Sequence, residues 1–323
     1  MKLTSTEQLL LELLRRPSES GQEVVLATWL ETRLAGRFLV ERLPVDRERF
    51  NLLVRAGSVE PRKVLLAHID TVPGQLTARV EPDRICGRGS CDNKGSVAAM
   101  ITAVELVAEQ GRQDFALLLT VGEETGCDGA TAARREFGRR GWQPELVVVG
   151  EPTELYVVTA QKGVLAAHII CTGTEAHSSL PDPDSATTKL VELLHRLTQE
   201  CPPDTTFNIG RLSGGVAANI VAGRAEASVS WRTSHSELRR QVEAAVASVD
   251  GCQLEIKLDR PPVDHSHFGF PHREVAFFSE MDQFENSLLC GPGSITQAHS
   301  ENEFISRTEL KRAVEVYRSF LES

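Results

Sequence analysis

The sequence predicts an α/β fold, with a mostly parallel sheet in one domain and a ferredoxin-like βαββαβ domain inserted into it. Two features support this prediction. Short apolar runs alternate with helical patterns before about residue 160 and again after about residue 262, as in parallel sheets whose strands are joined by helices. Between these regions the patterns follow the order strand, helix, strand, strand, helix, strand, which is typical of a split βαβ unit.

The outer domain, residues 1–161 and 263–323, is predicted to alternate helices with buried strands. Helices are expected where apolar residues recur at helical spacing, and the turn Pro17–Gly21 separates the first two. The expected helices are 6–16, 21–35, 94–110 and about 129–138, and the expected strands are Lys63–Ala67, Phe115–Val121, Leu146–Gly150 and Ser287–Cys290.

The inserted domain, residues 162–262, has a different rhythm. In the stretch 224–232, small and apolar residues alternate with polar ones, as in a strand with one buried face. In 185–200, apolar residues lie at helical spacing. The expected strands are Val164–Cys171, 206–213, 224–232 and Cys252–Leu258, and the expected helices are 185–200 and about 238–246.

Composition narrows the class of protein. The chain has 323 residues, 41% of them hydrophobic, and a formal net charge of −10. This charge argues against a nucleic-acid partner, whose phosphates need a basic face. No apolar run approaches the roughly 18 residues that a membrane span needs. The seven cysteines are odd in number and include no C-x-x-C pair, so neither a disulfide framework nor a zinc knuckle is expected. A soluble protein of the reducing cytoplasm is the simplest interpretation.

Metal-binding side chains follow the predicted strands of the outer domain. His68, Glu124 and Glu151 each come directly or shortly after a strand, and His299 follows the last strand through a glycine turn. Asp92 comes from a glycine-containing loop just before the helix 94–110. Because ligands of open α/β sheets bind at the carboxyl ends of the strands, these five side chains are expected to converge.

This ligand set predicts two metal ions. Mixed imidazole and carboxylate ligands suit zinc, with cobalt and manganese as alternatives. Five protein ligands are too many for one catalytic zinc, which keeps about three and an open position. They divide well between two ions about 3.5–4 Å apart if one carboxylate bridges.

At these residues the chain resembles the M20 family of metallopeptidases and deacylases. The resemblance is strongest to its acetylornithine deacetylase and succinyl-diaminopimelate desuccinylase branch. The matching segments, in family order, are His68–Pro73, Gly87–Gly95, Glu123–Gly126, Gly150–Thr153, Ala176–Pro181 and Gly291–Gly293 with Ala298-His299 and Asn302-Glu303.

The resemblance implies a role for each residue of the centre. Asp92 would bridge two metal ions, and His68, Glu124, Glu151 and His299 would complete their ligand shells. Asp70 would orient His68 and raise its basicity. Glu123 would be the general base toward a metal-bridged hydroxide.

For the inserted domain, the resemblance implies a lid that also forms a homodimer. His177 would donate to the developing oxyanion. Arg232 and Asn219 would bind the substrate carboxylate, and Gly293 of the outer domain would offer a backbone N–H. The sequence departs from the family at Ser230, where many relatives carry an acid before the arginine, and at Arg273, where relatives of the deacetylase type carry a threonine.

The expected activity is metal-dependent hydrolysis of an N-acyl amino acid, with N-acetylornithine of arginine biosynthesis as the leading substrate. The same metal site would also serve a succinyl-diaminopimelate desuccinylase, an acetyl-lysine-type deacylase or a dipeptidase. A catalytically silent binding protein is the non-enzymatic alternative. The acyl group, the metal and the oligomeric state stay open in the sequence.

Overall fold

The computed structural model describes residues 2–58 and 60–323. The chain forms two compact units, which we describe separately. The first unit contains Met1–Thr159, His265–Arg273 and Ser279–Ser323, and the second contains Ala160–Asp264 and Glu274–Phe278. The boundaries expected from the sequence lay at 161/162 and 262/263.

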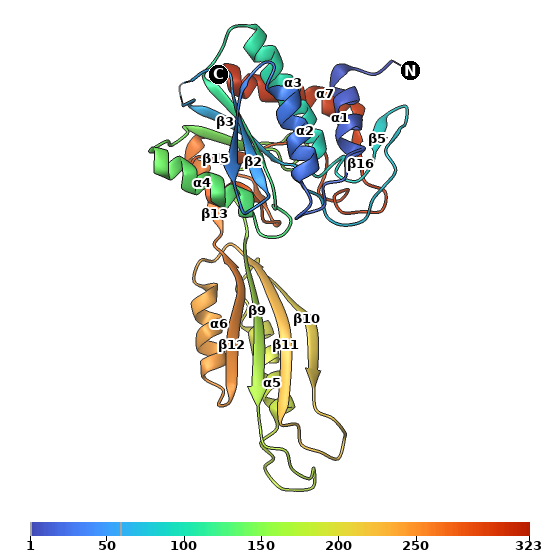
Figure 1. Cartoon of the computed structure of the whole chain (residues 1–323). Coiled ribbons are helices and arrows are strands. Elements are labelled where there is room, and N and C mark those ends of the chain that lie inside the picture. Colours follow the sequence, from blue (N-terminus) through green and yellow to red (C-terminus); the bar gives the residue numbers. More distant parts are fainter. Residues whose placement is uncertain (1, 59) are drawn as a thin grey trace. The chain divides into compact units, whose positions relative to one another are not determined.

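The first unit is built on a six-stranded sheet of order β1-β2-β6-β3-β7-β15 (Figure 1). Strands β6, β3, β7 and β15 are parallel, whereas β2 is antiparallel to β6 and β1 is antiparallel to β2. The sheet is therefore mostly parallel, as predicted. The strands are β1 (Leu39–Pro44), β2 (Phe50–Arg55), β3 (Lys63–His68), β6 (Phe115–Thr120), β7 (Leu146–Val149) and β15 (Ser287–Leu289).

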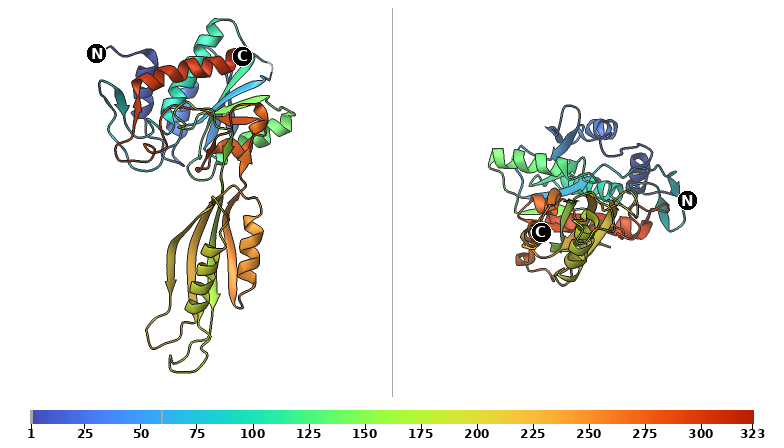
Figure 2. Two further views of the ribbon diagram at one scale, coloured as in Figure 1. Left: turned by 180° about the vertical axis from the view of Figure 1, so that it is seen from behind. Right: turned by 90° about the horizontal axis from the view of Figure 1, so that it is seen from below.

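Helices cover both faces of this sheet (Figures 1 and 2). The main core joins α1, α2, α3 and α7 to alternate residues of the strands, such as Leu65 and Ala67 of β3. Helix α4 and the short 3-10 helix η2 pack together, with α4 also against β1 and β2. The helices are α1 (Ser5–Leu14), α2 (Val24–Leu34), α3 (Lys94–Glu109), α4 (Asp128–Arg140), η1 (Ser266–Phe268), η2 (Glu280–Gln283) and α7 (Arg307–Glu322).

A small sheet of order β16-β5-β4 borders the first unit's main core. Ile85 and Ile305 are fully buried in that core. Helix α7 starts directly after β16, where the side chain of Ser306 accepts a hydrogen bond from the backbone N–H of Glu309. The strands are β4 (Arg79–Val80), β5 (Arg84–Cys86) and β16 (Phe304–Ser306).

The second unit has a four-stranded antiparallel sheet of order β10-β11-β9-β12. Helices α5 and α6 pack on one face through a separate apolar core around Trp231. The chain order β9-α5-β10-β11-α6-β12 is the predicted βαββαβ order. The elements are β9 (Gly163–Thr172), α5 (Ala186–Gln199), β10 (Thr206–Gly214), β11 (Arg224–Thr233), α6 (Leu238–Ala247) and β12 (Cys252–Arg260), and a small sheet adds β8 (Ala160–Gln161), β13 (Val263–Asp264) and β14 (Glu274–Val275).

A disulfide joins Cys171 to Cys252 across the neighbouring strands β9 and β12. This bond was not expected from the sequence. The two residues are 81 positions apart, and only the strand pairing places them side by side. Cys86, Cys91, Cys127, Cys201 and Cys290 are not disulfide-bonded. Among the described residues, no helix has the length and apolar character that crossing a membrane requires.

Candidate metal centre

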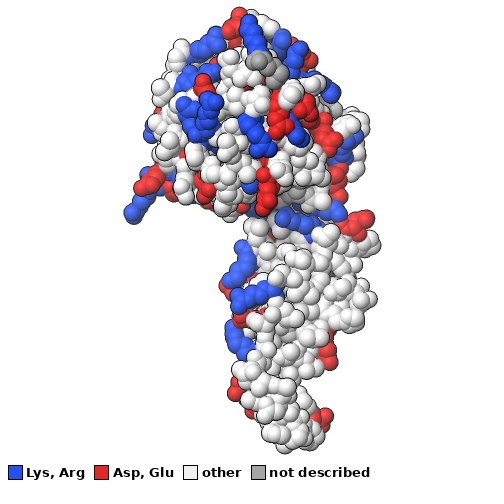
Figure 3. Space-filling model, turned by 90° about the vertical axis from the view of Figure 1, so that its right-hand side faces the viewer, with Lys and Arg blue, Asp and Glu red and all other residues white. Residues whose placement is uncertain are grey.

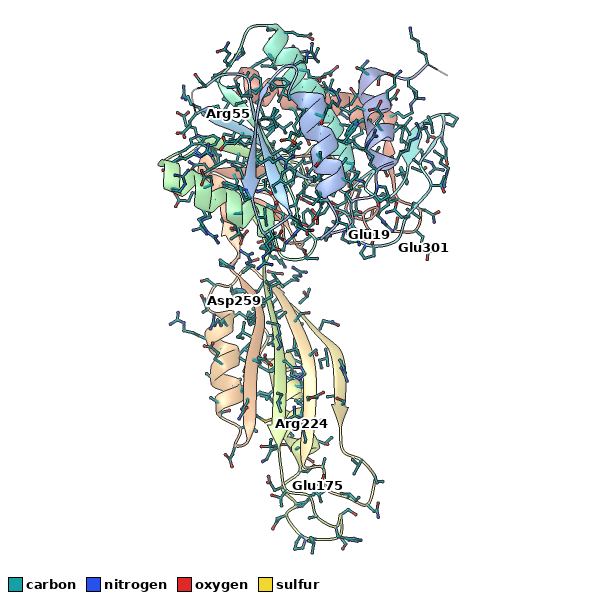
Figure 4. All side chains as sticks on the ribbon, viewed as in Figure 1. Glu19, Arg55, Glu175, Arg224, Asp259 and Glu301 are labelled. Carbon is teal, nitrogen blue, oxygen red and sulfur yellow. A yellow bond between two sulfur atoms is a disulfide. The ribbon has the colours of Figure 1, made fainter. Side chains whose placement is uncertain are left out.

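The candidate ligands lie where the parallel strands of the first unit end. Strand pairing sets His68 of β3 opposite Thr120 of β6, and Leu66 opposite Val149 of β7. The residues that follow these strands therefore emerge at one edge of the sheet. In Figure 4, Glu19 and Glu301, from two loops beside the site, lie toward this edge, and Arg55 lies toward the other.

One cluster at this edge consists of His68, Asp92 and Glu151. The His68 ring atom Nε2 lies 3.0 Å from Asp92 Oδ1 and 3.9 Å from Glu151 Oε1. All three residues are buried. Asp92 reaches the cluster from the loop before α3, in which the Asp92–Asn93 peptide bond is cis.

A second cluster consists of Asp92, Glu124 and His299. The His299 ring atom Nε2 lies 2.9 Å from Glu124 Oε1 and 3.3 Å from Asp92 Oδ2. His299 has a backbone φ of +61°, a left-handed conformation that costs a non-glycine residue free energy. The surrounding loop thus holds this imidazole toward the carboxylates against a local preference.

Asp92 belongs to both clusters and directs one oxygen to each: Oδ1 faces His68 and Oδ2 faces His299. This is the geometry of a carboxylate that bridges two ions. Oε1 of the buried Glu151 has no hydrogen-bond partner among the described residues, although buried polar atoms are normally paired. A donor set of imidazoles and carboxylates with an unpaired buried oxygen fits two divalent cations.

Asp70 supports the centre without belonging to either cluster. His68 Nδ1 lies 3.1 Å from the backbone oxygen of Asp70 and 3.4 Å from its Oδ1. When the proton is on Nδ1, Nε2 keeps a lone pair that can bind a metal ion. The Asp70 carboxylate also accepts hydrogen bonds from Ser20 Oγ and from the backbone N–H groups of Glu123 and Glu124.

Glu123 comes one residue before the candidate ligand Glu124, in the turn after β6. Burial, followed by repulsion from Glu151, raises the pKa of Glu123 well above its usual value. Glu123 is a member of neither cluster. The geometry therefore leaves this carboxylate free to exchange a proton beside the centre.

The ligand side chains also shift one another's pKa. Burial opposes charging of Asp92, but hydrogen bonds from His299 and His68 hold its pKa below the ordinary value. Burial and the nearby Asp92 raise the pKa of Glu151 well above its ordinary value. Hydrogen bonds to Asp92 and Glu124 raise the pKa of His299 to about 10. This concentration of acids attracts cations, whether protons or metal ions.

Two further loops of the first unit shape the centre. The buried Glu303 accepts the backbone N–H groups of Cys91 and Asp92, and its other oxygen accepts Arg88 Nη1 at 2.7 Å. Gly293 has a φ of +92°, and a Cβ there would lie 2.5 Å from Cys91 Sγ. No described residue accepts a hydrogen bond from the Gly293 N–H, so this donor is available to a ligand.

The other three predicted site residues lie in the second unit. His177 Nδ1 accepts the backbone N–H of Ser179 at 3.3 Å, so a neutral ring carries its proton on Nε2. The backbone of Ser178 donates to Asn219 O, which brings the His177 and Asn219 loops together. Arg232 lies on β11 opposite Val164 of β9; burial lowers the pKa of its guanidinium, which has no acidic partner among the described residues.

Three residues beside the centre have no role predicted from the sequence: Ser20, Glu280 and Glu303. Glu303 had a signal, because it belongs to the matched segment Asn302-Glu303. Ser20 and Glu280 had none. Ser20 lies in a turn, and Glu280 lies in a short 3-10 helix that no apolar pattern announces.

Comparison with known proteins agrees with this geometry. Residues 64–323 match peptidase family M20/M25/M40. A probable carboxypeptidase of Aspergillus flavus is 34% identical over 86% of this chain and 76% of its own length. A probable carboxypeptidase of Aspergillus terreus is 32% identical over 97% of this chain and 84% of its own length.

Solved structures share the fold at low sequence identity. An M20 family metallo-carboxypeptidase from Sulfolobus solfataricus has a TM-score of 0.76 at 16% identity, covering 99% of each chain. A dinuclear metal-binding peptidase of the M20 family from Bacillus subtilis has a TM-score of 0.71 at 16% identity, covering 98% of this chain and 96% of its own. These structures support the α/β architecture described above.

Proposed function

This chain belongs to peptidase family M20/M25/M40 and is a metallohydrolase, and we propose that it cleaves amide bonds in the manner of a carboxypeptidase. Its substrate would be an amide whose nitrogen belongs to an amino acid with a free α-carboxylate. The observation that carries the proposal is the pair of clusters that share Asp92.

The side chains of the centre divide the work of hydrolysis. Two divalent ions, which we propose to be zinc, would polarise the amide carbonyl and lower the pKa of a water molecule. Glu123 takes a proton from the attacking water and delivers it to the leaving amine. Asp70 fixes the position of the Glu123 turn and the orientation of the His68 ring. The Gly293 N–H donates to the substrate, and the Nε2–H of His177 donates to the carbonyl oxygen as it becomes negative.

Arg232 supports a substrate with a free carboxylate. A half-buried guanidinium without an acidic partner costs free energy, and a carboxylate matches its planar set of donors. Asn219 lies beside the His177 loop, so it would add a neutral amide for the same group from the partner in the dimer proposed below. The relatives named above are peptidases and carboxypeptidases, so N-acetylornithine rests on the sequence motifs alone. N-acyl amino acids and dipeptides both carry the required free carboxylate.

A substrate panel with the zinc-loaded protein tests this proposal. The panel contains N-acetylornithine, N-succinyl-diaminopimelate, N-acetyl-lysine and dipeptides, each with a free and with an amidated carboxyl group. We expect cleavage of one or more free acids and a loss of at least about tenfold in kcat/KM on amidation, since one charged pair is removed. Equal cleavage of both forms would contradict the carboxypeptidase mode. An inert protein that retains two ions would point to a binding protein.

We also propose that the second unit forms a homodimer in which His177 acts on a substrate bound by the partner. Within this unit, Arg232 lies opposite Val164 near the start of β9, whereas His177 follows the end of β9. Figure 4 labels Asp259 near the first end and Arg224 and Glu175 toward the second. A ten-residue strand spans about 30 Å. One small substrate therefore cannot touch both residues of a single copy.

Strand β10 offers an edge for this dimer. It ends the four-stranded sheet, and Ile209 and Leu212 are exposed on it. Figure 3 shows a face of the second unit on which uncharged side chains predominate. An unprotected apolar edge strand readily pairs with another chain.

Mixing two inactive variants tests the dimer. Glu123→Gln and His177→Ala alone should each be far less active than the wild type. If His177 serves the partner, random reassortment should restore about a quarter of wild-type activity, since half of the dimers are mixed and each holds one complete site. Absence of recovery, with exchange of subunits verified by a mass-tagged copy, would contradict the shared site.

A further inference from the structure

Glu280 is a fully buried carboxylate beside the candidate metal centre. It begins the 3-10 helix η2 and has an exposed fraction of 0%. The helix is fixed at both sides: Ser279 Oγ accepts the backbone N–H of Met281, and Ser287 Oγ of β15 donates to the backbone oxygen of Met281. Glu280 is thus held in place by its surroundings.

The contacts of Glu280 place it behind the strand ends that carry the candidate ligands. Its Oε2 accepts a hydrogen bond of 3.0 Å from Thr120 Oγ1. Thr120 is the β6 residue opposite His68, and its backbone oxygen accepts the N–H of Ile69.

Nothing among the described residues neutralises this carboxylate well. Its Oε1 has no hydrogen-bond partner, and no described cationic side chain forms an ion pair with it. Glu23 is another fully buried acid: Arg49 Nη1 lies 3.7 Å from its Oε1, but neither carboxylate oxygen has a hydrogen-bond partner among the described residues. A buried carboxylate without a cation destabilises the folded protein. Stability alone therefore gives no reason for an acid at position 280.

We propose that Glu280 is a positioning residue for the two metal ions, a non-ligating anion whose charge strengthens their binding from behind the sheet edge. The negative charge of Glu280 lies behind Thr120 and the strand ends, and its carboxylate makes no bond to either ion. Surrounding acids of this kind commonly tune the affinity of metal centres. The inference rests on the two-ion centre and is independent of the substrate.

The test compares metal binding with the stability of the metal-free protein. Glu280→Gln keeps the size of the side chain and an acceptor for Thr120, but removes the charge. Zn²⁺ affinity, measured by competition with a chromophoric chelator, should fall about tenfold or more. The unfolding midpoint in EDTA should stay at or above the wild-type value. Glu280→Asp, which keeps the charge, should recover most of the affinity.

Two control variants separate charge from structure. Thr120→Val removes the hydrogen bond and keeps the charge, so Zn²⁺ affinity should change less than in Glu280→Gln. Glu23→Gln removes another buried acid, whose pKa is raised chiefly by burial, so the metal-free protein should keep or gain stability. Wild-type Zn²⁺ affinity in Glu280→Gln would overturn the proposal. The proposal would also be overturned if Glu280→Gln lowered the unfolding midpoint, relative to wild type, by the same amount in EDTA as in the zinc-loaded protein.

Discussion

The backbone N–H of Glu123 donates a hydrogen bond of 3.1 Å to Oδ1 of Asp70. The same oxygen lies 3.4 Å from Nδ1 of His68. One buried carboxylate therefore fixes the proposed general base and a candidate ligand together, although they follow different strands. The chemistry of the centre depends on this link, because the base must reach a water molecule that the ions activate.

Asp70→Asn tests the link. The amide replaces one carboxylate oxygen with a donor, so it cannot accept all of the hydrogen bonds from Ser20, Glu123 and Glu124. We expect kcat/KM or Zn²⁺ affinity to fall about 10- to 100-fold. Activity assays with chelator competition measure both quantities. Ser20→Ala removes one donor and should have a smaller effect; an Asp70→Asn enzyme with unchanged values would separate Asp70 from catalysis.

Glu123→Gln distinguishes the base from the ligands. The amide cannot accept a proton, but neither candidate cluster includes Glu123. We expect two ions per chain to remain bound, while kcat falls about 10²- to 10⁴-fold. Elemental analysis and steady-state kinetics on one preparation give both values. Glu124→Gln is the matched variant, since it should lose metal as well. Substantial turnover by Glu123→Gln would require another base.

Much of the centre was predictable because its residues follow parallel strands. His68, Glu124 and Glu151 had to emerge at one edge once β3, β6 and β7 were recognised as parallel, and the two clusters contain all five predicted ligands. The bridging role of Asp92 is an expectation from resemblance and stays a prediction; in the structure its two oxygens face different histidines.

Other features depend on contacts that no local pattern records. Strands β1 and β2 were not predicted, in part because the polar Asn51 interrupts the apolar run of β2. Asn51 is fully buried and bonds the backbone at Val121 and Gly129, so it satisfies polar groups inside the fold. Glu280 was not predicted for a similar reason: among the described residues, the only hydrogen-bond partner of its carboxylate is Thr120, 160 residues away.

Metal binding should release protons. Hydrogen bonds to Asp92 and Glu124 raise the pKa of His299 from 6.5 to about 10, so the free ring is protonated at pH 8. A metal ion binds the unprotonated ring, and apparent Zn²⁺ affinity should therefore weaken as pH falls. Calorimetry in buffers of different ionisation enthalpy measures the protons released. His299→Ala should release about one fewer, and zero release at pH 8 by the wild type would contradict the assignment.

The Glu7–Arg307 pair predicts a pH-dependent contribution to stability. Arg307 Nε lies 2.6 Å from Glu7 Oε1 and joins α7 to α1, where Glu7 also completes a capping box with Thr4. Burial opposes the charge on Glu7, but the bonds from Arg307 and Thr4 hold its pKa below 4.5. A lowered folded-state pKa gives stability that is present above the unfolded pKa and lost as pH falls through the folded value.

Glu7→Gln should thus lower the free energy of unfolding by about 2 kcal/mol at pH 7, and the difference from wild type should shrink below about pH 4.5. Urea unfolding from pH 7 to pH 4 measures this, with Arg307→Gln and the double variant as a cycle. A difference that stays constant to the lowest pH would assign the effect to packing instead of charge.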